Sequence, residues 1–443
     1  MSPTLALSLW LVCLLALLYF DPARDSRTSW ALWVPLTWMF FVSTRLPSQW
    51  FGSQVGLAAT AFEEGNPIDR IFFLALILLA IGILLLRSFN WGGFVACNLA
   101  LTTLITFALV SVTWSDFPLV ALKRWFRDSG NYLMILVVIS DPQPLEAVRA
   151  FFRRFCFLLV PLSILLIKYY PTIGVQYSAW TGGAMYVGPT TGKNLLGVIC
   201  LLSGVSLFWD TTTRWSLRKD RRTKFIIFVN ISFFLTTLWL LYITNSATSR
   251  VCLVLGCLVI AAVQSSWGSR HTTFVKTVIP ACFLLYLTLA FGFNLNGKLA
   301  EGVGRDPTLT DRTLIWDVVL NQNTNFLIGT GYESFWLGPR LRRIWEQVGA
   351  INEAHNGYLE TYLSLGMIGV LLLAIFIVAS YQKNYKRPKS HPNLTSLKLA
   401  LWTIAVFYNM AEAAFYWHPV WIAFLLGAIA LPETVETSGP ILT

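Results

Sequence analysis

The stretch "GVLLLAIFIVAS", residues 369–380, contains no charged residue and overlaps the end of the polar segment "EAHNGYLETYLSLGMIG", residues 353–369. Apolar runs of this kind recur along the whole chain, and the first is "LALSLWLVCLLALLYF", residues 5–20. A helix rises about 1.5 Å per residue, so a run of roughly 20 residues crosses about 30 Å of hydrocarbon. The sequence therefore predicts an all-α polytopic membrane protein.

The composition supports this fold class and excludes an ordinary soluble domain. Of 443 residues, 56% are hydrophobic and only 12% are charged, against a charged fraction of about 25% in soluble domains. The run 5–20 could be mistaken for a signal peptide. However, the first basic residue is Arg24 and no small-residue cleavage site follows cleanly, so we expect a transmembrane helix there.

We expect twelve or thirteen transmembrane helices, because the first span and the division of the last pair are the least distinct. The expected spans are 5–20, 30–46, 70–88, 94–113, 119–140, 152–169, 194–209, 224–243, 250–267, 274–292, 357–380, 397–413 and 416–431.

The formal charge of +11 is concentrated in two short loops. Residues 210–224 have six basic and two acidic residues, and residues 383–398 have five basic and none acidic, so together they hold nine of the eleven excess charges. Short loops rich in Lys and Arg stay on the cytoplasmic side of a membrane. We therefore expect topology determinants facing anionic membrane lipids, and no nucleic-acid partner.

This orientation places residues 293–356, with a net charge of −1, on the outer face as the only large soluble element. The side of the membrane on which the N-terminus lies depends on the number of spans. With this orientation the chain divides into four parts. They are a bundle of about ten helices (1–292), an extracytoplasmic loop with short helices (293–356), the last transmembrane helices (357–431) and a cytoplasmic tail (432–443).

Several motif resemblances fail on spacing. "GPTTGKN", residues 188–194, has three residues between its glycines where a phosphate-binding loop needs four, and "GTGYES", residues 329–334, lacks the third glycine of a dinucleotide fingerprint. The chain contains no Asp-x-Asp and no His-Glu-x-x-His sequence. We therefore predict neither a metal nor a cofactor.

Cationic residues gather on the expected outer side. Arg250 opens one span, Lys193 another, and Arg305 and Arg312 belong to the outer loop. Cations at a boundary between membrane and water suit a ligand with an anionic head and an apolar tail, such as a polyprenyl pyrophosphate. The simpler alternative, a side chain that reaches the lipid headgroups, is favoured for Lys193 alone.

The segment before residue 357 carries Glu353, His355 and Asn356. A helix cap would explain Asn356. It would not explain why Asn356, Glu360 and Ser364, each four residues apart, keep one helix face polar for two turns.

The pattern of His-Asn, nine residues and then Gly-x-x-Gly resembles the signature of the O-antigen ligase and O-antigen or exopolysaccharide polymerase superfamily. The resemblance extends over residues 94–380. Five further motifs occur in the same order as in exopolysaccharide polymerases. They are "SVTWSDFP" (111–118), "TGKNLLG" (191–197), "SATSR" (246–250), "DRTLIW" (311–316) and "LIGTGYESF" (327–335). Asp311 departs from the pattern, which has a glycine before the Arg-Thr pair.

This resemblance implies a GT-C-like, metal-independent glycosyltransferase of the bacterial inner membrane. It would use a polyprenyl-pyrophosphate-linked glycan donor and a saccharide acceptor at the outer face. His355 would be the base or would orient the acceptor, and Arg250 and Arg312 would hold the donor pyrophosphate. Weaker substrate-binding candidates are Lys193, Arg305, Glu353 and Asn356.

Polymerisation of repeat units is the preferred reaction, with a flippase and a chain-length regulator as possible partners. Ligation of finished glycan to lipid A-core or protein is the alternative within the superfamily. A transporter is the alternative in a different class, and Glu412, near the last pair of spans, is the ionisable residue that this site leaves unexplained.

Overall fold

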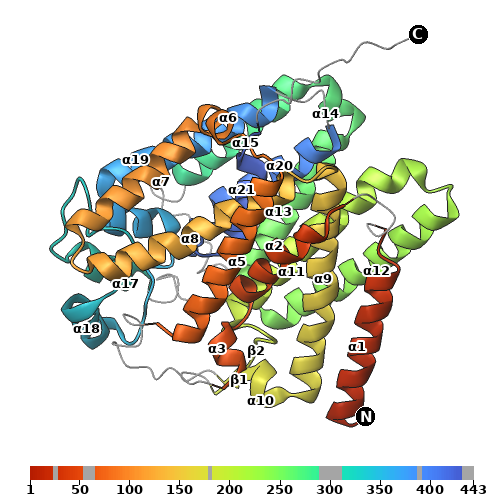
Figure 1. Ribbon diagram of the computed structural model, residues 1–443, viewed down its shortest axis with the longest axis horizontal. Helices are drawn as coiled ribbons and strands as arrows, with labels where there is room; N and C mark the ends of the chain where they lie inside the picture. Colours follow the sequence, from red (N-terminus) through yellow and green to blue (C-terminus); the bar gives the residue numbers. More distant parts are fainter. Residues whose placement is uncertain (23–27, 53–64, 178–181, 289–311, 387–391, 432–443) are drawn as a thin grey trace.

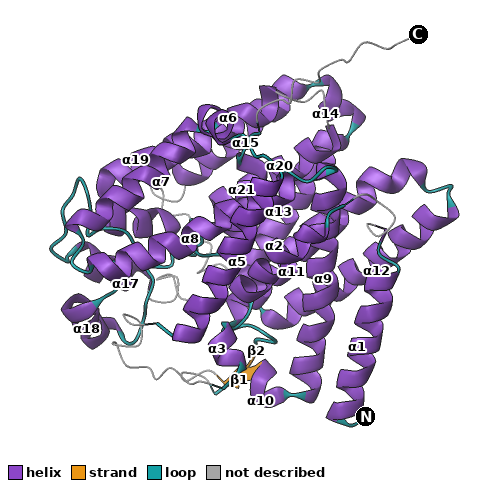
Figure 2. Ribbon diagram, in the orientation of Figure 1, coloured by secondary structure: helices purple, strands orange, loops and turns teal. Residues whose placement is uncertain are grey.

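The computed structural model describes all residues except 23–27, 53–64, 178–181, 289–311, 387–391 and 432–443. The described chain is almost entirely helical (Figure 2), and its one sheet is an antiparallel pair, β1 (Val175–Tyr177) and β2 (Ala184–Tyr186). The prediction of an all-α polytopic membrane protein is confirmed.

The first half of the chain forms helices α1 to α10 (Figure 1). Their bounds are α1 Pro3–Tyr19, η2 Trp30–Leu32, α2 Trp33–Ser43, α3 Pro47–Trp50, α5 Pro67–Leu86, α6 Trp91–Cys97, α7 Leu99–Val110, η3 Ser111–Trp114, α8 Pro118–Ile139, α9 Pro144–Tyr169 and α10 Pro171–Gly174. Many of these helices have proline in the first turn, where its fixed φ favours helix entry and its missing N–H costs nothing.

The second half forms helices α11 to α21. Their bounds are α11 Lys193–Arg214, η4 Trp215–Leu217, α12 Arg221–Thr244, α13 Ala247–Gln264, α14 Ser266–Arg270, α15 Thr272–Leu287, α17 Arg312–Leu320, α18 Gly338–Val348, α19 Gly357–Lys386, α20 Pro392–Tyr408 and α21 Pro419–Ala428.

Each of the thirteen predicted spans overlaps a helix in the structure. Six described helices are long and apolar enough to cross a membrane, namely α5, α9, α11, α12, α13 and α19, and four shorter apolar helices accompany them. The number of spans, twelve or thirteen, therefore stays a prediction. The span expected at 397–413 ends earlier, because α20 stops at Tyr408 and residues 409–418 form a loop.

The span expected at 94–113 is a bent pair of helices, α6 and α7, at an angle of 99°. The bend occurs at Asn98, whose side-chain amide donates to the carbonyls of Phe94 and Ala430 at 2.9 and 2.8 Å. Its amide oxygen also accepts from the Ala430 N–H. Because this side chain takes the place of backbone partners, the chain can change direction here without losing hydrogen bonds.

Helices α11 and α21 occupy the centre of the bundle. All ten residues of α21 are buried, and so are most of those of α11, which packs against α9, α12, α13 and α20. In contrast, α1, α5 and α12 leave large apolar side chains exposed, as expected of helices that face lipid.

Residues 312–356 form a small layer of their own at one end of the bundle (Figure 1). Helices α17 and α18 share a second hydrophobic core with the start of α19, built from Ile315, Val319, Phe335, Ile344, Ala354 and Leu363. The short helices expected in this loop are therefore present, and the loop is fastened to α19.

The loop between α17 and α18 also breaks α19 at Gly366, where φ is +65°. The N–H groups of Met367 and Ile368 donate to the carbonyls of Phe326 and Leu327 at 2.9 and 3.1 Å. A β-carbon on Gly366 would lie 2.3 Å from the Leu327 carbonyl oxygen. This glycine therefore permits a contact between two backbones. The segment "GTGYES" that follows residue 328 is a loop turn, as the sequence indicates.

We predict that Gly366→Ala destabilises the protein, because alanine would combine a clash against backbone with a left-handed φ that costs about 1–3 kcal/mol. The melting temperature of the detergent-solubilised protein should fall by several degrees. Gly82→Ala in α5 is the matched control, since a β-carbon there has no neighbour within 4 Å. Equal melting temperatures for the two variants would contradict this account of the break in α19.

Candidate active site

The start of α19 is joined to the loop between α20 and α21. The N–H of Gly357 donates to the carbonyls of Asn409 and Glu412 at 2.9 and 3.1 Å. A β-carbon on Gly357 would come within 2.0 Å of the Asn409 side-chain oxygen, so only glycine permits this approach. Since His355 lies two residues earlier, the contact brings it close to Glu412.

Asn356 caps α19, as the simpler interpretation of the sequence suggested. Its side-chain oxygen accepts from the N–H groups of Tyr358 and Leu359 at 3.0 and 3.1 Å. His355 precedes the cap with a left-handed φ of +49°. The cap and this turn fix the direction in which the imidazole leaves the helix.

Glu412 is the centre of the site. One carboxylate oxygen, Oε1, accepts from Arg312 Nη2 and from Asn194 Nδ2, each at 3.1 Å. The other oxygen, Oε2, lies 3.3 Å from Nδ1 of His355. The Glu412 side chain is only 9% exposed. It therefore joins α11, α17 and the start of α19 from within a largely buried position.

His355 contacts two carboxylates through a single ring nitrogen. Nδ1 lies 2.9 Å from Glu353 Oε1 and 3.3 Å from Glu412 Oε2. A carboxylate at Nδ1 fixes the proton there and leaves Nε2 for other partners. Among the described residues, no hydrogen bond occupies Nε2, so this nitrogen is available to a substrate.

The two carboxylates also determine the charge of the imidazole. Burial alone would lower the pKa of His355, but the hydrogen bonds and negative charges of Glu353 and Glu412 outweigh it and raise the pKa to about 10. His355 is therefore a cation at neutral pH in the unliganded protein.

Glu353, His355 and Glu412 have the ligand types of a divalent metal site, and their donor atoms lie within 4.8 Å of one another. However, Arg312 shares the carboxylate of Glu412, and a guanidinium disfavours a second cation at the same oxygen. The donor set therefore suits a protonated ring better than a metal. The absence of a metal requirement stays a prediction.

The other predicted site residues make no described contact with Glu412 or His355. Arg250, on the first turn of α13, donates to the side chain of Asn245, and its Nε is buried without a hydrogen-bond partner among the described residues. Lys193 begins α11 next to Asn194, and within the described chain it makes no hydrogen bond or ion pair. Arg305 and Asp311 lie outside the described residues.

Sequence reasoning missed the roles of Glu412 and Asn194. An acid in the otherwise apolar segment "NMAEAAFYW" was the available signal, since a buried charge needs a partner. Asn194 belongs to the quoted motif "TGKNLLG", in which only the neighbouring Lys193 was predicted to bind substrate. No sequence pattern relates residue 194 to residue 412.

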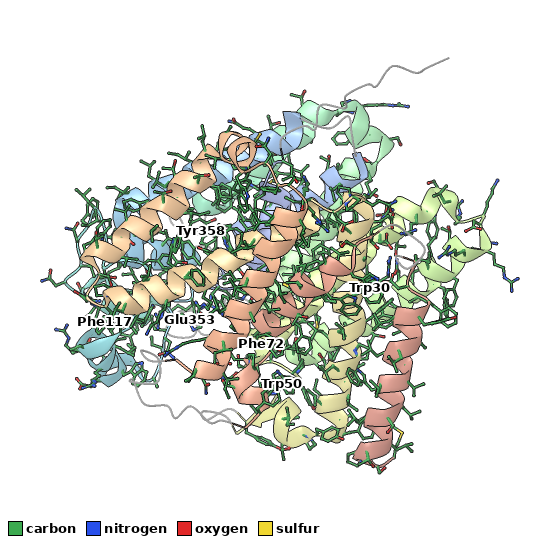
Figure 3. The ribbon with its side chains drawn as sticks, in the orientation of Figure 1. Trp30, Trp50, Phe72, Phe117, Glu353 and Tyr358 are labelled. Atoms are coloured by element: carbon green, nitrogen blue, oxygen red, sulfur yellow. The ribbon has the colours of Figure 1, made fainter. Side chains whose placement is uncertain are left out.

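A cavity of about 1040 Å³ adjoins the site on the Glu353 side. Its walls come from α5, α8 and α19 and from the loops at residues 333–336 and 413–417. On α19, Gly357, Glu360 and Ser364 line it, so two of the three residues of the polar face noticed in the sequence, Glu360 and Ser364, belong to the cavity wall. Glu360 accepts from Trp336 Nε1 at 2.9 Å and from the N–H of Ala354. Figure 3 labels Glu353 beside α8.

Comparison with known proteins finds similarity over part of the chain. Residues 231–374 match the model of a family described as O-antigen ligase, and this range contains Arg250, Arg312, Glu353 and His355. The exopolysaccharide production protein ExoQ of Rhizobium meliloti (strain 1021) is 28% identical over 153 residues. That alignment covers 33% of this chain and 34% of ExoQ, about a third of each.

The charge on His355 can be measured directly. In protein labelled with ¹⁵N-histidine we expect one of the four imidazoles to titrate near pH 10. Glu353→Gln removes one of the two carboxylates at Nδ1 and should lower this pKa toward the ordinary value of about 6.5. Glu346→Gln, which changes an acid of α18 outside the cluster, serves as the control. A His355 that titrates near pH 6.5 in the unmodified protein would contradict the ion-paired arrangement.

Proposed function

We propose that this protein is a membrane glycosyltransferase that moves a glycan from a polyprenyl pyrophosphate to a saccharide hydroxyl, since residues 231–374 match the model of a family described as O-antigen ligase. The observation that carries the proposal is the pair of carboxylates at Nδ1 of His355, one of which also holds Arg312. This arrangement brings together a potential base and a cation for a pyrophosphate.

In the proposed reaction, the His355 imidazolium first loses its Nε2 proton to solvent and keeps the proton on Nδ1. Nε2 of the neutral ring then removes the proton of the acceptor hydroxyl. The hydroxyl oxygen forms a bond to the anomeric carbon of the donor sugar, and the bond from that carbon to the pyrophosphate oxygen breaks. The pyrophosphate leaves as an anion, and the imidazolium is stabilised by Glu353 and Glu412. Attack opposite the leaving group would invert the anomeric configuration.

Arg312 would exchange partners when the donor binds. In the unliganded protein its Nη2 donates to Glu412, and its side chain is 17% exposed, so a pyrophosphate can reach it. Guanidinium groups stabilise the charge that develops on a departing phosphate oxygen. Arg250, whose buried Nε has no partner among the described residues, is the second proposed ligand. Lys193 and Arg305 remain weaker candidates.

Polymerisation is the preferred reaction, because the quoted motif order resembles exopolysaccharide polymerases and because the aligned relative is named an exopolysaccharide production protein. The description of the matching family favours ligation as the second candidate. In either case we propose a bacterial inner-membrane location with the site facing outward, and polymerisation would add a flippase and a chain-length regulator as partners.

His355→Ala should reduce the yield of long polymer in a complemented deletion strain by roughly 10²–10⁴-fold, the usual contribution of a general base. Glu412→Gln should also reduce it, since Arg312 and His355 would lose their shared partner. His271→Ala, which alters an exposed histidine beside Trp267, serves as the control. Normal polymer from His355→Ala cells with equal amounts of membrane protein would disprove the mechanism.

The deletion strain itself separates polymerisation from ligation. Loss of a polymerase should leave single repeat units attached or accumulating, whereas loss of a ligase should leave intact polymer on its lipid carrier. Gel profiles of the extracted glycans measure the difference. Intact lipid-linked polymer in the deletion strain would overturn polymerisation in favour of ligation.

A further inference from the structure

The cavity beside Glu353 has a second group of cations that the proposed donor site does not use. Three of them lie on α8, in the second and third turns after Pro118, and one lies in the first turn of α5. They are Lys123, Arg124, Arg127 and Arg70. Charges on membrane helices are costly, and such residues commonly mark a substrate site.

These cations lie at the same end of the bundle as His355. The residues before α8 are bound to the loop that contains α18, because Arg340 Nη2 lies 2.7 Å from Asp116 Oδ2. The hydroxyls of Ser115 and Ser334 also lie 2.6 Å apart. The first turns of α8 therefore face the same compartment as the site.

Two of the cations have structural roles. Arg127 Nε pairs with Asp128 at 2.7 Å, and its guanidinium covers the Trp417 ring at 4.1 Å from the ring centre. Arg124 donates to the carbonyl of Glu333. These contacts hold α8 against the loops at 333–336 and 413–417.

The other two cations have no ion pair among the described residues. Lys123 is exposed and makes no described hydrogen bond, and Arg70 donates only to the carbonyl of Gly65 at 3.2 Å. Their positive charges are therefore available to a ligand in the cavity.

The acids that line the same cavity are already bound by neighbouring groups. Asp69 accepts from Ser48, Glu333 lies 3.9 Å from Arg127, and Glu353 pairs with His355. Glu360 accepts from Trp336. Asp69 and Glu360 have neutral partners, but none of these four acids forms an ion pair with Lys123 or Arg70 in the described part of the chain.

Beside the cations, part of the cavity wall is apolar and exposed. Leu74 of α5 and Leu122 and Phe126 of α8 line the cavity and are 43–44% exposed. In a multi-pass membrane protein, exposed apolar side chains of this kind contact the lipid chains. The cavity thus offers a cationic wall and an apolar wall that is continuous with the membrane.

We propose that Lys123 and Arg70 bind the pyrophosphate of a second polyprenyl-linked saccharide, the acceptor, whose lipid chain lies along Leu74, Leu122 and Phe126. This inference rests on the proposed function and extends it, because donor and acceptor then occupy separate anion sites. Glu353 lines the cavity and contacts His355, so the acceptor hydroxyl reaches the base from this side, and Arg312 holds the donor beyond Glu412.

The test measures binding of undecaprenyl pyrophosphate without sugar to the full chain in lipid nanodiscs. The unmodified protein should saturate at about two equivalents, and Arg312→Gln should retain about one. The double variant Lys123→Gln with Arg70→Gln should weaken the other site about tenfold or more, the scale of one lost charge-assisted contact. Lys123→Arg should retain binding, and Lys168→Gln, an exposed lysine at the end of α9 outside the cavity, is the matched control.

Two comparisons identify the ligand. Undecaprenyl monophosphate should bind the second site more weakly than the pyrophosphate, and inorganic pyrophosphate should not compete at equal concentration. Equal competition by inorganic pyrophosphate would overturn the role of the apolar wall.

Turnover assays with a lipid-linked acceptor separate this inference from the proposed function. The double variant should raise the KM for the acceptor about tenfold or more while the KM for the donor stays unchanged. If the double variant changes neither binding nor this KM, the second site is disproved while the base role of His355 stands. If His355→Ala keeps full activity but the double variant loses binding, the proposed reaction fails and the second site remains.

Discussion

The site depends on the carboxylate of Glu412. Its two oxygens hold three side chains from three separate parts of the chain: Asn194, Arg312 and His355. A carboxylate with so little exposure is stable only with such partners. If it is neutralised, Arg312 loses its carboxylate partner and His355 keeps only Glu353. The same group thus keeps the bundle, the outer layer and the start of α19 in register.

Features of this protein that depend on residues close together in the sequence could be predicted, and features that depend on residues far apart in the sequence could not. Long apolar runs are local signals, and each of the thirteen predicted spans overlaps a helix. His355 and Glu353 are two residues apart, so their association is visible in the sequence. Glu412 is 57 residues from His355 and Asn194 is 218 residues from Glu412, and only the packing of α11 and α20 brings them together. The high pKa of His355 could not be predicted, because it requires the second carboxylate.

The motif that resembles the signature of the O-antigen ligase and polymerase superfamily combines several structural requirements. Within "HNG", the asparagine caps α19 and the glycine allows the Asn409 side chain to approach. Only the histidine has a ring nitrogen left for chemistry. At the other end of the signature, Gly366 breaks α19. Most of the pattern therefore encodes the position of one side chain, which explains why a short motif can identify a site in a long membrane protein.

The break at Gly366 also determines where the layer of residues 312–356 lies along α19. Backbone N–H groups that leave a helix inside hydrocarbon must be satisfied by protein, and here the carbonyls of residues 326 and 327 accept them. The turn that contains these carbonyls is therefore inserted alongside α19, nearly three helical turns beyond the imidazole. These hydrogen bonds thus fix the position of the layer that carries Arg312 relative to α19. The depth of His355 relative to α19 is therefore set by the backbone, and the proposed lipid-linked substrate would reach it by lateral diffusion in the membrane.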